Sequence, residues 1–380
     1  MRTRFMRKGV YVALMLAFAL VAAACGGGTN ETTTSTAATG GTETTTTTTA
    51  APGASTTTTT EPAGMPGEGV KVGMAYDIGG RGDKSFNDSA AAGLDRAKEE
   101  FGIEVQELEP TAGGENREEN LRLLAEGGFD PIFAIGFAFA EGVDRVAQDF
   151  PDTTFAIVDS VVEQPNVLSL VFAEHEGSAL VGAAAALKSQ TGTIGFIGGV
   201  NIGLINKFEA GYRFGAEYVK PDIEILSTYL TEPPDFSGFN DPAKGKEAAL
   251  AMFEQGADVV YHAAGGSGTG LFQAAKEFTE QGGSKVWGIG VDSDQYNTVD
   301  PELRDYVMTS MLKRVDVAVY TTIKNFVEEV PQDPITVFDV KADGVGYSTS
   351  GGFVDDIVPQ LEELKQKIID GMVTVPDTLE

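Results

Sequence analysis

The sequence is poor in the residues on which metal and redox chemistry depend. It has a single cysteine, Cys25, and two histidines, His175 and His262, among 380 residues. One cysteine excludes internal disulfides and any zinc or iron–sulfur site built from several cysteines, and two histidines leave little for a histidine-based metal centre. We therefore expect neither a metal nor a cofactor.

Basic residues are also scarce. The chain has 27 Lys and Arg against 56 Asp and Glu, which gives a formal net charge of −29. A surface that binds nucleic acid needs a basic face to neutralise phosphates, and this composition does not favour one. An anionic membrane surface is disfavoured for the same reason.

Long apolar runs are missing except near the amino terminus. There, basic residues precede an apolar run at 9–24, which ends in small residues directly before Cys25. This pattern is typical of an export signal, and the cysteine after the cleavage point is typical of a bacterial lipoprotein. We predict a lipoprotein signal peptide at 1–24, lipidation of Cys25, and attachment to the extracytoplasmic side of the cell membrane. The alternative is an ordinary secretory signal followed by an unmodified thiol.

Residues 25–69 have few large apolar side chains and are rich in Thr, Ala, Gly, Pro and Ser. Such a segment buries too little apolar surface to offset the entropy lost on ordering. We predict a disordered tether, and a flexible coil of roughly 45 residues has an end-to-end distance of about 35–40 Å.

From residue 70 onward, short apolar runs alternate with longer amphipathic stretches, which is typical of parallel sheets flanked by helices. The predicted strands are 70–77, 103–108, 131–136, 155–160, 167–172, 193–198, 223–230, 258–263, 285–291 and 306–311. The predicted helices are 86–101, 116–127, 139–149, 174–189, 206–219, 242–255, 269–281, 316–329 and 358–370. About ten strands suit two α/β lobes of about five strands each, with a cleft between them.

Motifs of catalysis and of nucleotide binding are missing. The sequence has no G-x-S-x-G, H-E-x-x-H or C-x-x-C. The glycine-rich segments at 79–87 and 265–270 have the wrong spacing for a phosphate loop or a dinucleotide fingerprint. Asp292-Ser293-Asp294 resembles an acid pair, but a catalytic site needs more than carboxylates, and neither histidine lies in a recognisable nucleophile setting. We expect a protein that is not an enzyme.

Carboxylates stand where predicted strands end, and two phenylalanines lie in loops. In open parallel sheets, ligands collect beyond the carboxyl ends of the strands. Asp77, Asp159 and Asp292 could accept hydrogen bonds from hydroxyl or ring N–H groups, and Phe86 and Phe239 could contact an aromatic ring. These residues favour a neutral, polar, partly aromatic ligand. Alternatively, the phenylalanines pack between lobes and Asp77 and Asp292 cap helices or brace loops.

Four segments carry a resemblance to a known family. They are D-K-S-F-N at 83–87, G-F-N-D-P-A-K-G at 238–245, G-V-D-S-D-Q at 290–295 and S-M-L-K-R at 310–314. With these segments in this order, the chain resembles the basic membrane protein lipoproteins, which are substrate-binding proteins of ABC transporters and include purine nucleoside receptors.

The resemblance implies a type I periplasmic-binding-protein fold of two parallel-sheet α/β lobes joined by a hinge. The expected division is 70–175 with 295–330 in lobe I, and 176–294 with 331–380 in lobe II. The resemblance implies that Phe86 and Phe239 sandwich the base. Asn87 and Asp159 are then expected to read the edge of the base, and Asp77 to support the loop or the ligand. The ribose is expected to be held by Asp292, Lys313, Gly265 and Gly266.

Under this interpretation, closure of the lobes around a purine nucleoside or related molecule is the signal read by a membrane permease and its ATPase. We expect a monomer. Two alternatives remain open at this point: a ligand sensor of the same fold that reports to a membrane kinase, and a tethered surface antigen or adhesin without a small ligand.

Overall fold

The structure is a computed structural model and describes residues 64–379. The two sheets lie in one compact unit of the chain. The predicted signal peptide, Cys25 and most of the predicted tether lie outside the described residues. The end of that tether was predicted wrongly, because the chain is folded before residue 70: Pro66 is buried, and the Gly67 N–H donates to the Phe101 carbonyl at 2.9 Å.

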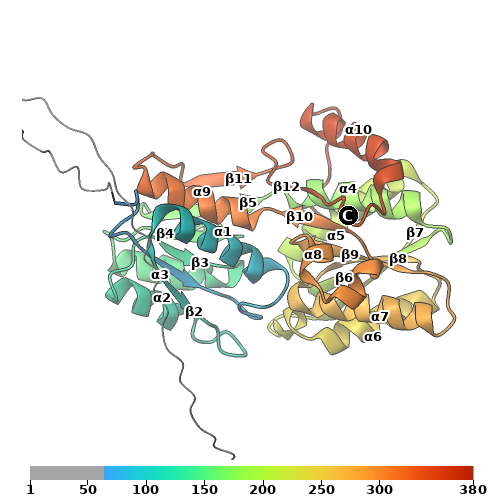
Figure 1. Ribbon diagram of the computed structural model, residues 1–380, viewed down its shortest axis with the longest axis horizontal. Helices are drawn as coiled ribbons and strands as arrows, with labels where there is room; N and C mark the ends of the chain where they lie inside the picture. The colour runs from blue at the N-terminus through green and yellow to red at the C-terminus, as the bar shows by residue number, and fades with distance from the viewer. Residues whose placement is uncertain (1–63, 380) are drawn as a thin grey trace, which may run out of the picture. The chain divides into compact units, whose positions relative to one another are not determined.

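The first sheet has six strands in the order β11-β5-β4-β3-β1-β2, all of them parallel. Its strands are β1 (Lys71–Ala75), β2 (Glu104–Leu108), β3 (Ile132–Ala134), β4 (Phe155–Val158), β5 (Val167–Phe172) and β11 (Ile335–Phe338) (Figure 1). Successive residues of β1 face opposite sides of this sheet. Val72 and Met74 are buried in one core cluster, and Ala75 is buried in another.

The second sheet also has six strands, in the order β12-β10-β9-β8-β6-β7. Its strands are β6 (Thr193–Val200), β7 (Glu224–Thr231), β8 (Val259–Ala263), β9 (Trp287–Asp292), β10 (Val307–Lys313) and β12 (Val345–Tyr347). All pairs are parallel except β10 with β12. The predicted α/β class is confirmed.

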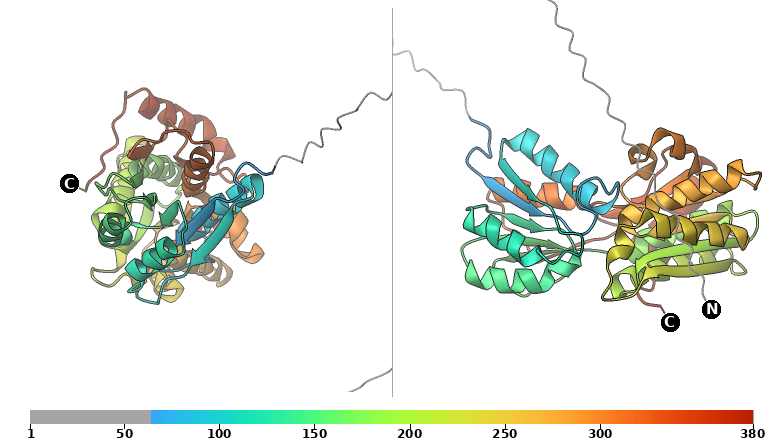
Figure 2. Two further views of the ribbon diagram at one scale, coloured as in Figure 1. Left: turned by 90° about the vertical axis from the view of Figure 1, so that its left-hand side faces the viewer. Right: turned by 90° about the horizontal axis from the view of Figure 1, so that it is seen from below.

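Helices flank the sheets on both faces (Figures 1 and 2). The longer helices are α1 (Phe86–Phe101), α2 (Arg117–Glu126), α3 (Ala140–Asp149), α4 (Glu174–Lys188), α5 (Gly203–Val219), α6 (Pro242–Glu254), α7 (Thr269–Glu280), α9 (Val315–Val327) and α10 (Val358–Ile369). The short helical turns are η1 (Phe137–Phe139), η2 (Ser237–Phe239), η3 (Gly265–Gly268), α8 (Gln295–Thr298), η4 (Pro301–Tyr306) and η5 (Asp355–Ile357).

The helices pair across the two faces of each sheet. In the first sheet, α1 packs against α9, while α2 and α3 supply the core of the opposite face. In the second sheet, α4 packs against α5, while α6 and α7 supply the opposite core. Each sheet therefore has helices on both of its faces.

The start of α6 shows how local sequence fixes an element. Asp241 is the N-cap, and its side chain accepts a hydrogen bond from the Lys244 N–H at 3.0 Å. Pro242 occupies the first helical position, where a missing N–H has no intrahelical partner to lose. Beyond the end of the helix, Gly256 has a φ of +101°, which favours glycine. The predicted start of this helix is confirmed, and the helix ends at Glu254, one residue before the predicted end.

Every predicted strand and helix has a counterpart, but the structure adds β11, β12 and α8. These elements were missed because they are short: β12 has three residues, and β11 is an edge strand with alternately exposed side chains. The predicted lobe boundaries are therefore wrong at two strands. β10 belongs to the second sheet rather than to lobe I, and β11 belongs to the first sheet rather than to lobe II.

Candidate ligand-binding cleft

A cavity of about 680 Å³, including solvent at its mouth, lies where the carboxyl ends of strands from both sheets meet. It is lined by Asp77, Ile78, Asp83, Phe86, Asn87, Arg117, Gly136, Phe137, Ala138, Asp159, Leu204, Ile205, Phe208, Phe236, Phe239, Ala263, Gly265, Val291, Asp292 and Lys313.

The structure brings the predicted ligand residues together with one exception. Gly266 does not line this cavity, whereas the neighbouring Gly265 does. The others that line it are Asp77, Phe86, Asn87, Asp159, Phe239, Asp292 and Lys313. Their roles toward a ligand remain predictions.

The apolar part of the cavity is aromatic. Phe86 begins α1 on the first sheet, and Phe239 ends η2 on the second. Phe137 follows β3, and its ring lies edge-on to Phe236 at 5.8 Å and to Phe239 at 6.5 Å between ring centres. Phe137 from the first sheet and Phe236 and Phe239 from the second therefore form one aromatic wall, which suits the face of a planar ring.

Lys313, at the end of β10, is the centre of a buried ion-pair cluster. Its Nζ lies 2.7 Å from Asp159 Oδ2 and 3.1 Å from Glu174 Oε1. Although burial opposes the charge, these carboxylates and Asp292 raise the pKa of Lys313 above its ordinary value. The ammonium also lies 5.2 Å from the centre of the Phe86 ring. Lys313 is therefore a permanent cation in the cavity lining, beside Phe86.

Asp159 follows β4 and keeps one oxygen free. Burial raises the pKa of its carboxyl, against the opposing charge of Lys313. Oδ2 is paired with Lys313, but the buried Oδ1 has no hydrogen-bond partner among residues 64–379. Buried polar atoms normally have partners, so this oxygen is available to a donor on a ligand.

Asp292 ends β9 and is also buried. Its Oδ2 accepts a hydrogen bond from Ser85 Oγ at 2.5 Å. Burial raises the pKa of its carboxyl from 3.8 to about 7, with Lys313 and Ser85 opposing the shift. Asp159 and Asp292 both have positive φ, +68° and +63°, a strained conformation for residues other than glycine. Such strain is typical of functional sites.

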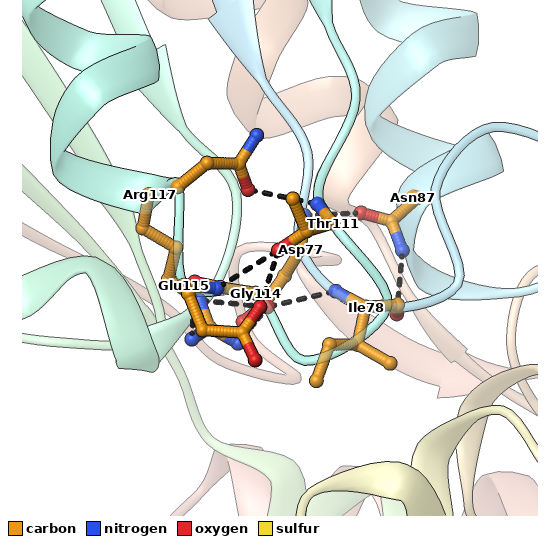
Figure 3. Close-up of polar contacts among 8 residues, drawn as sticks. Asp77, Ile78, Asn87, Thr111, Gly114, Glu115 and Arg117 are labelled. Carbon is orange, nitrogen blue, oxygen red and sulfur yellow. Dashed lines mark hydrogen bonds and ion pairs between the residues drawn. The ribbon is translucent and has the colours of Figure 1, made fainter.

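The loop after β1 is braced by its own polar side chains (Figure 3). Asn87 Oδ1 accepts from the Asp77 N–H at 3.2 Å, and its Nδ2 donates to Asp83 Oδ2 at 3.0 Å. Asp83 also accepts from the Ser85, Asn87 and Asp88 N–H groups at the start of α1. Asn87 therefore contributes to the shape of the loop, in addition to any contact with a ligand.

Several lining residues were missed from the sequence: Asp83, Arg117, Phe137, Leu204, Ile205, Phe208 and Phe236. Phe137 could have been found, because it follows a strand at G-F-A-F and obeys the same strand-end rule as Asp77. Arg117 lies far from its strand in the sequence and had no such signal.

Within residues 64–379, no group of three or more His, Cys, Asp or Glu side chains could hold a metal ion. In the same part of the chain, no helix has the length and apolar character to cross a membrane.

Residues 70–379 match the family described as ABC transporter substrate-binding protein PnrA-like. The chain belongs to this family. It is 34% identical to the CD4+ T-cell-stimulating antigen of Listeria innocua, over 80% of this chain and 88% of that protein. It is also 34% identical to the ABC transporter nucleoside-binding protein BmpA of Lactococcus lactis, over 81% of this chain and 89% of that protein.

A solved structure of a related protein also matches this chain. An ABC transporter solute-binding protein from Aeropyrum pernix aligns with a TM-score of 0.71 and 33% identity, covering 81% of this chain and 94% of that one. The predicted resemblance is confirmed, as are the type I periplasmic-binding-protein fold and the expectation of a binding protein rather than an enzyme. Membership implies a small-molecule ligand and an ABC permease as partner.

Proposed function

We propose that this protein captures a purine nucleoside outside the cytoplasm, while anchored to the membrane by a lipid on Cys25, and delivers it to an ABC permease. The observation that carries the proposal is the cavity itself, in which an aromatic wall from both sheets faces buried carboxylates. The printed name of the relative from Lactococcus lactis, a nucleoside-binding protein, is consistent with this ligand class.

The base lies between Phe86 and Phe239 in this proposal. Stacking on an aromatic side chain tolerates any purine, because every base has a π-face. The free Oδ1 of Asp159 accepts a hydrogen bond from the edge of the base, which gives this buried oxygen the partner that it lacks among the described residues.

The ribose lies toward Asp292, Gly265 and Lys313. A carboxylate accepts two hydrogen bonds from adjacent hydroxyls, which distinguishes a nucleoside from a free base. Gly265 has a positive φ, +54°, and lies close to Phe239, since a Cβ at Gly265 would stand 3.0 Å from the Phe239 carbonyl oxygen.

Closure follows from contacts that join the two sheets across the cleft. Ser85 Oγ donates to Asp292, Ser293 Oγ donates to the Ser85 carbonyl at 2.9 Å, and Gln295 Nε2 donates to the Lys84 carbonyl at 3.0 Å. A ligand that contacts residues of both sheets stabilises the arrangement in which these bonds form. The closed arrangement is then the state that a permease distinguishes from the open one.

The test is mass spectrometry of small molecules released by denaturing purified protein, followed by isothermal titration with the molecule found. We expect a purine nucleoside and one binding site per chain. As a control, the Phe86→Ala/Phe239→Ala double variant should release none. Release of a sugar or an amino acid instead, with no titration signal from any purine nucleoside, would contradict the proposal.

A further inference from the structure

Arg117 lines the cavity from a helix position that disfavours its charge. It is the first residue of α2, where the positive end of the helix dipole disfavours a cation. Its side chain is only 15% exposed and pairs with Asp77, which is 14% exposed. Both side chains line the cavity. A partly buried cation in a ligand cavity calls for an explanation in terms of the ligand.

The hydrogen bonds of Arg117 leave part of its guanidinium free. A guanidinium has five N–H groups and no acceptor. Nε donates to Asp77 Oδ1 at 2.9 Å, Nη2 donates to the same oxygen, and Nη1 donates to the Gly114 carbonyl at 3.0 Å. Among the contacts of residues 64–379, two N–H groups on the terminal nitrogens therefore have no acceptor.

Asp77 complements these donors. Its Oδ1 accepts from Arg117 and from the Ile78 N–H at 2.7 Å, whereas its Oδ2 makes no hydrogen bond within the described part of the chain. Gly136 lies beside Oδ2, and a Cβ at that position would stand 2.9 Å from it. The glycine therefore leaves this oxygen open. The pair presents a free acceptor next to two free donors.

The loop before α2 fixes the pair in place (Figure 3). The Thr111 N–H donates to Asn116 Oδ1 at 2.8 Å, and Asn116 Nδ2 donates back to the Glu109 carbonyl at 3.1 Å. Thr111 Oγ1 donates to Glu115 at 2.5 Å. A donor and an acceptor held in this way lose little entropy when they bind a ligand.

Resting on the proposed nucleoside function, we infer that Arg117 is a specificity-determining residue that selects purines with a carbonyl oxygen at C6 over purines with an amino group there. A carbonyl oxygen has two lone pairs, which match the two free N–H groups of Arg117. The adjacent ring N–H of a 6-oxopurine then donates to Asp77 Oδ2. An amino group offers the guanidinium no acceptor, and the ring nitrogen beside it has one lone pair.

The experiment measures dissociation constants by isothermal titration for inosine, adenosine and purine riboside, which has no substituent at C6. The variants are Arg117→Gln and Arg117→Lys, and the matched control is Arg122→Gln. Arg122 lies on the same helix but pairs with Glu118 and Asp149 at the surface, and it does not line the cavity.

The wild type and Arg122→Gln should bind inosine at least about tenfold more tightly than the other two nucleosides. With those nucleosides, an N–H group of Arg117 stays buried without an acceptor, which lowers affinity by roughly tenfold. Arg117→Gln should bind all three within about threefold, because its amide can either donate or accept. Arg117→Lys keeps the positive charge but lacks the planar guanidinium with its paired N–H groups, so it should also reduce the preference for inosine.

The inference is overturned by a wild type that binds all three nucleosides equally or prefers adenosine, and also by an Arg117→Gln protein that keeps the full preference. If thermal unfolding shows that Arg117→Gln does not fold, Arg117→Lys decides in its place, and an unreduced preference there overturns the inference. A wild type that binds no nucleoside overturns the proposed function itself, which equal binding of all three does not.

Discussion

At the scale of single residues, the two cavity phenylalanines test the proposed stacking. Phe86→Ala or Phe239→Ala should each weaken inosine binding by about 1–3 kcal/mol, roughly 5- to 150-fold, if each ring covers one face of the base. Hypoxanthine binding should fall by a similar factor, because the base alone contacts the rings. The control is Phe214→Ala on α5, outside the cavity lining. Equal affinities in all four proteins, measured by titration, would rule out the stack.

In the proposed ribose site, Asp292 should link ligand affinity and protein stability to pH. Ribose hydroxyls need the ionised carboxylate as acceptor, so inosine affinity should fall as the pH drops below about 7, the value to which burial raises this pKa. The inosine preference over hypoxanthine should disappear in Asp292→Ala. Titrations between pH 5.5 and 8.5 check both statements, and a preference that Asp292→Ala retains in full would remove Asp292 from the ribose site.

As the pH rises, the unliganded protein should become less stable, whereas its affinity for inosine should increase. The folded protein holds the Asp292 proton more tightly than the unfolded chain does, with a pKa of about 7 against 3.8. The contribution of the Asp292 carboxyl to the free energy of unfolding therefore falls as the pH rises from about 4 to about 7, and it stays low above pH 7. Asp292→Asn should stabilise the unliganded protein at pH 8 by at least about 1 kcal/mol. Urea denaturation at pH 5 and pH 8 measures this, and Asp294→Asn is the matched control.

At the scale of secondary-structure elements, Lys313 joins the end of β10 to residues after β4 and β5 through Asp159 and Glu174. Lys313→Met should destabilise the protein by about 3–5 kcal/mol, because two buried carboxylates lose their cation. The double variant Lys313→Met/Asp159→Asn should regain part of this loss. Denaturant unfolding provides the measurement, with Lys365→Met at the surface as the control. A loss below about 1 kcal/mol would show that the cluster is not a structural link.

The elements also show what the sequence could predict. Apolar runs and helix caps were sufficient for the strands and helices of both cores, because these are long and their patterns are regular. β11 and β12 were missed. Because β11 was missed, the sequence analysis did not show where the chain returns to the first sheet. The strand-end rule predicted Asp159 and Asp292, whose neighbours in sequence are buried strands. It did not predict Arg117, since only the fold of the 109–116 loop brings that side chain to Asp77.

At the scale of the whole molecule, charge should decide which ligands are excluded. The chain has a net charge of −29, and the cavity lining includes four aspartates against Arg117 and Lys313. A neutral nucleoside releases no counterions, so its affinity should be nearly independent of salt. Inosine monophosphate should bind far more weakly than inosine. Titrations at 20 and 500 mM salt test this, and a steep loss of inosine affinity with salt would indicate an anionic ligand instead.

Attachment to the membrane is a second property of the whole protein. If Cys25 carries the anchor, a fatty-acid analogue fed to producing cells should label the wild type and leave Cys25→Ser unlabelled. The Cys25→Ser protein should appear in the medium or in a soluble extracytoplasmic fraction. Equal labelling of both proteins would contradict the prediction.

The crossing of the chain between the sheets has a consequence for how the protein is made. The first sheet takes β1 to β5 from residues before 173, but its edge strand β11 comes from 335–338, after β10 has joined the second sheet. Neither lobe is therefore a continuous stretch of polypeptide, and neither can be completed until nearly the whole chain has been synthesised. On the predicted route of export, a nascent chain that is still passing through the membrane channel would thus lack a finished domain that could block its passage.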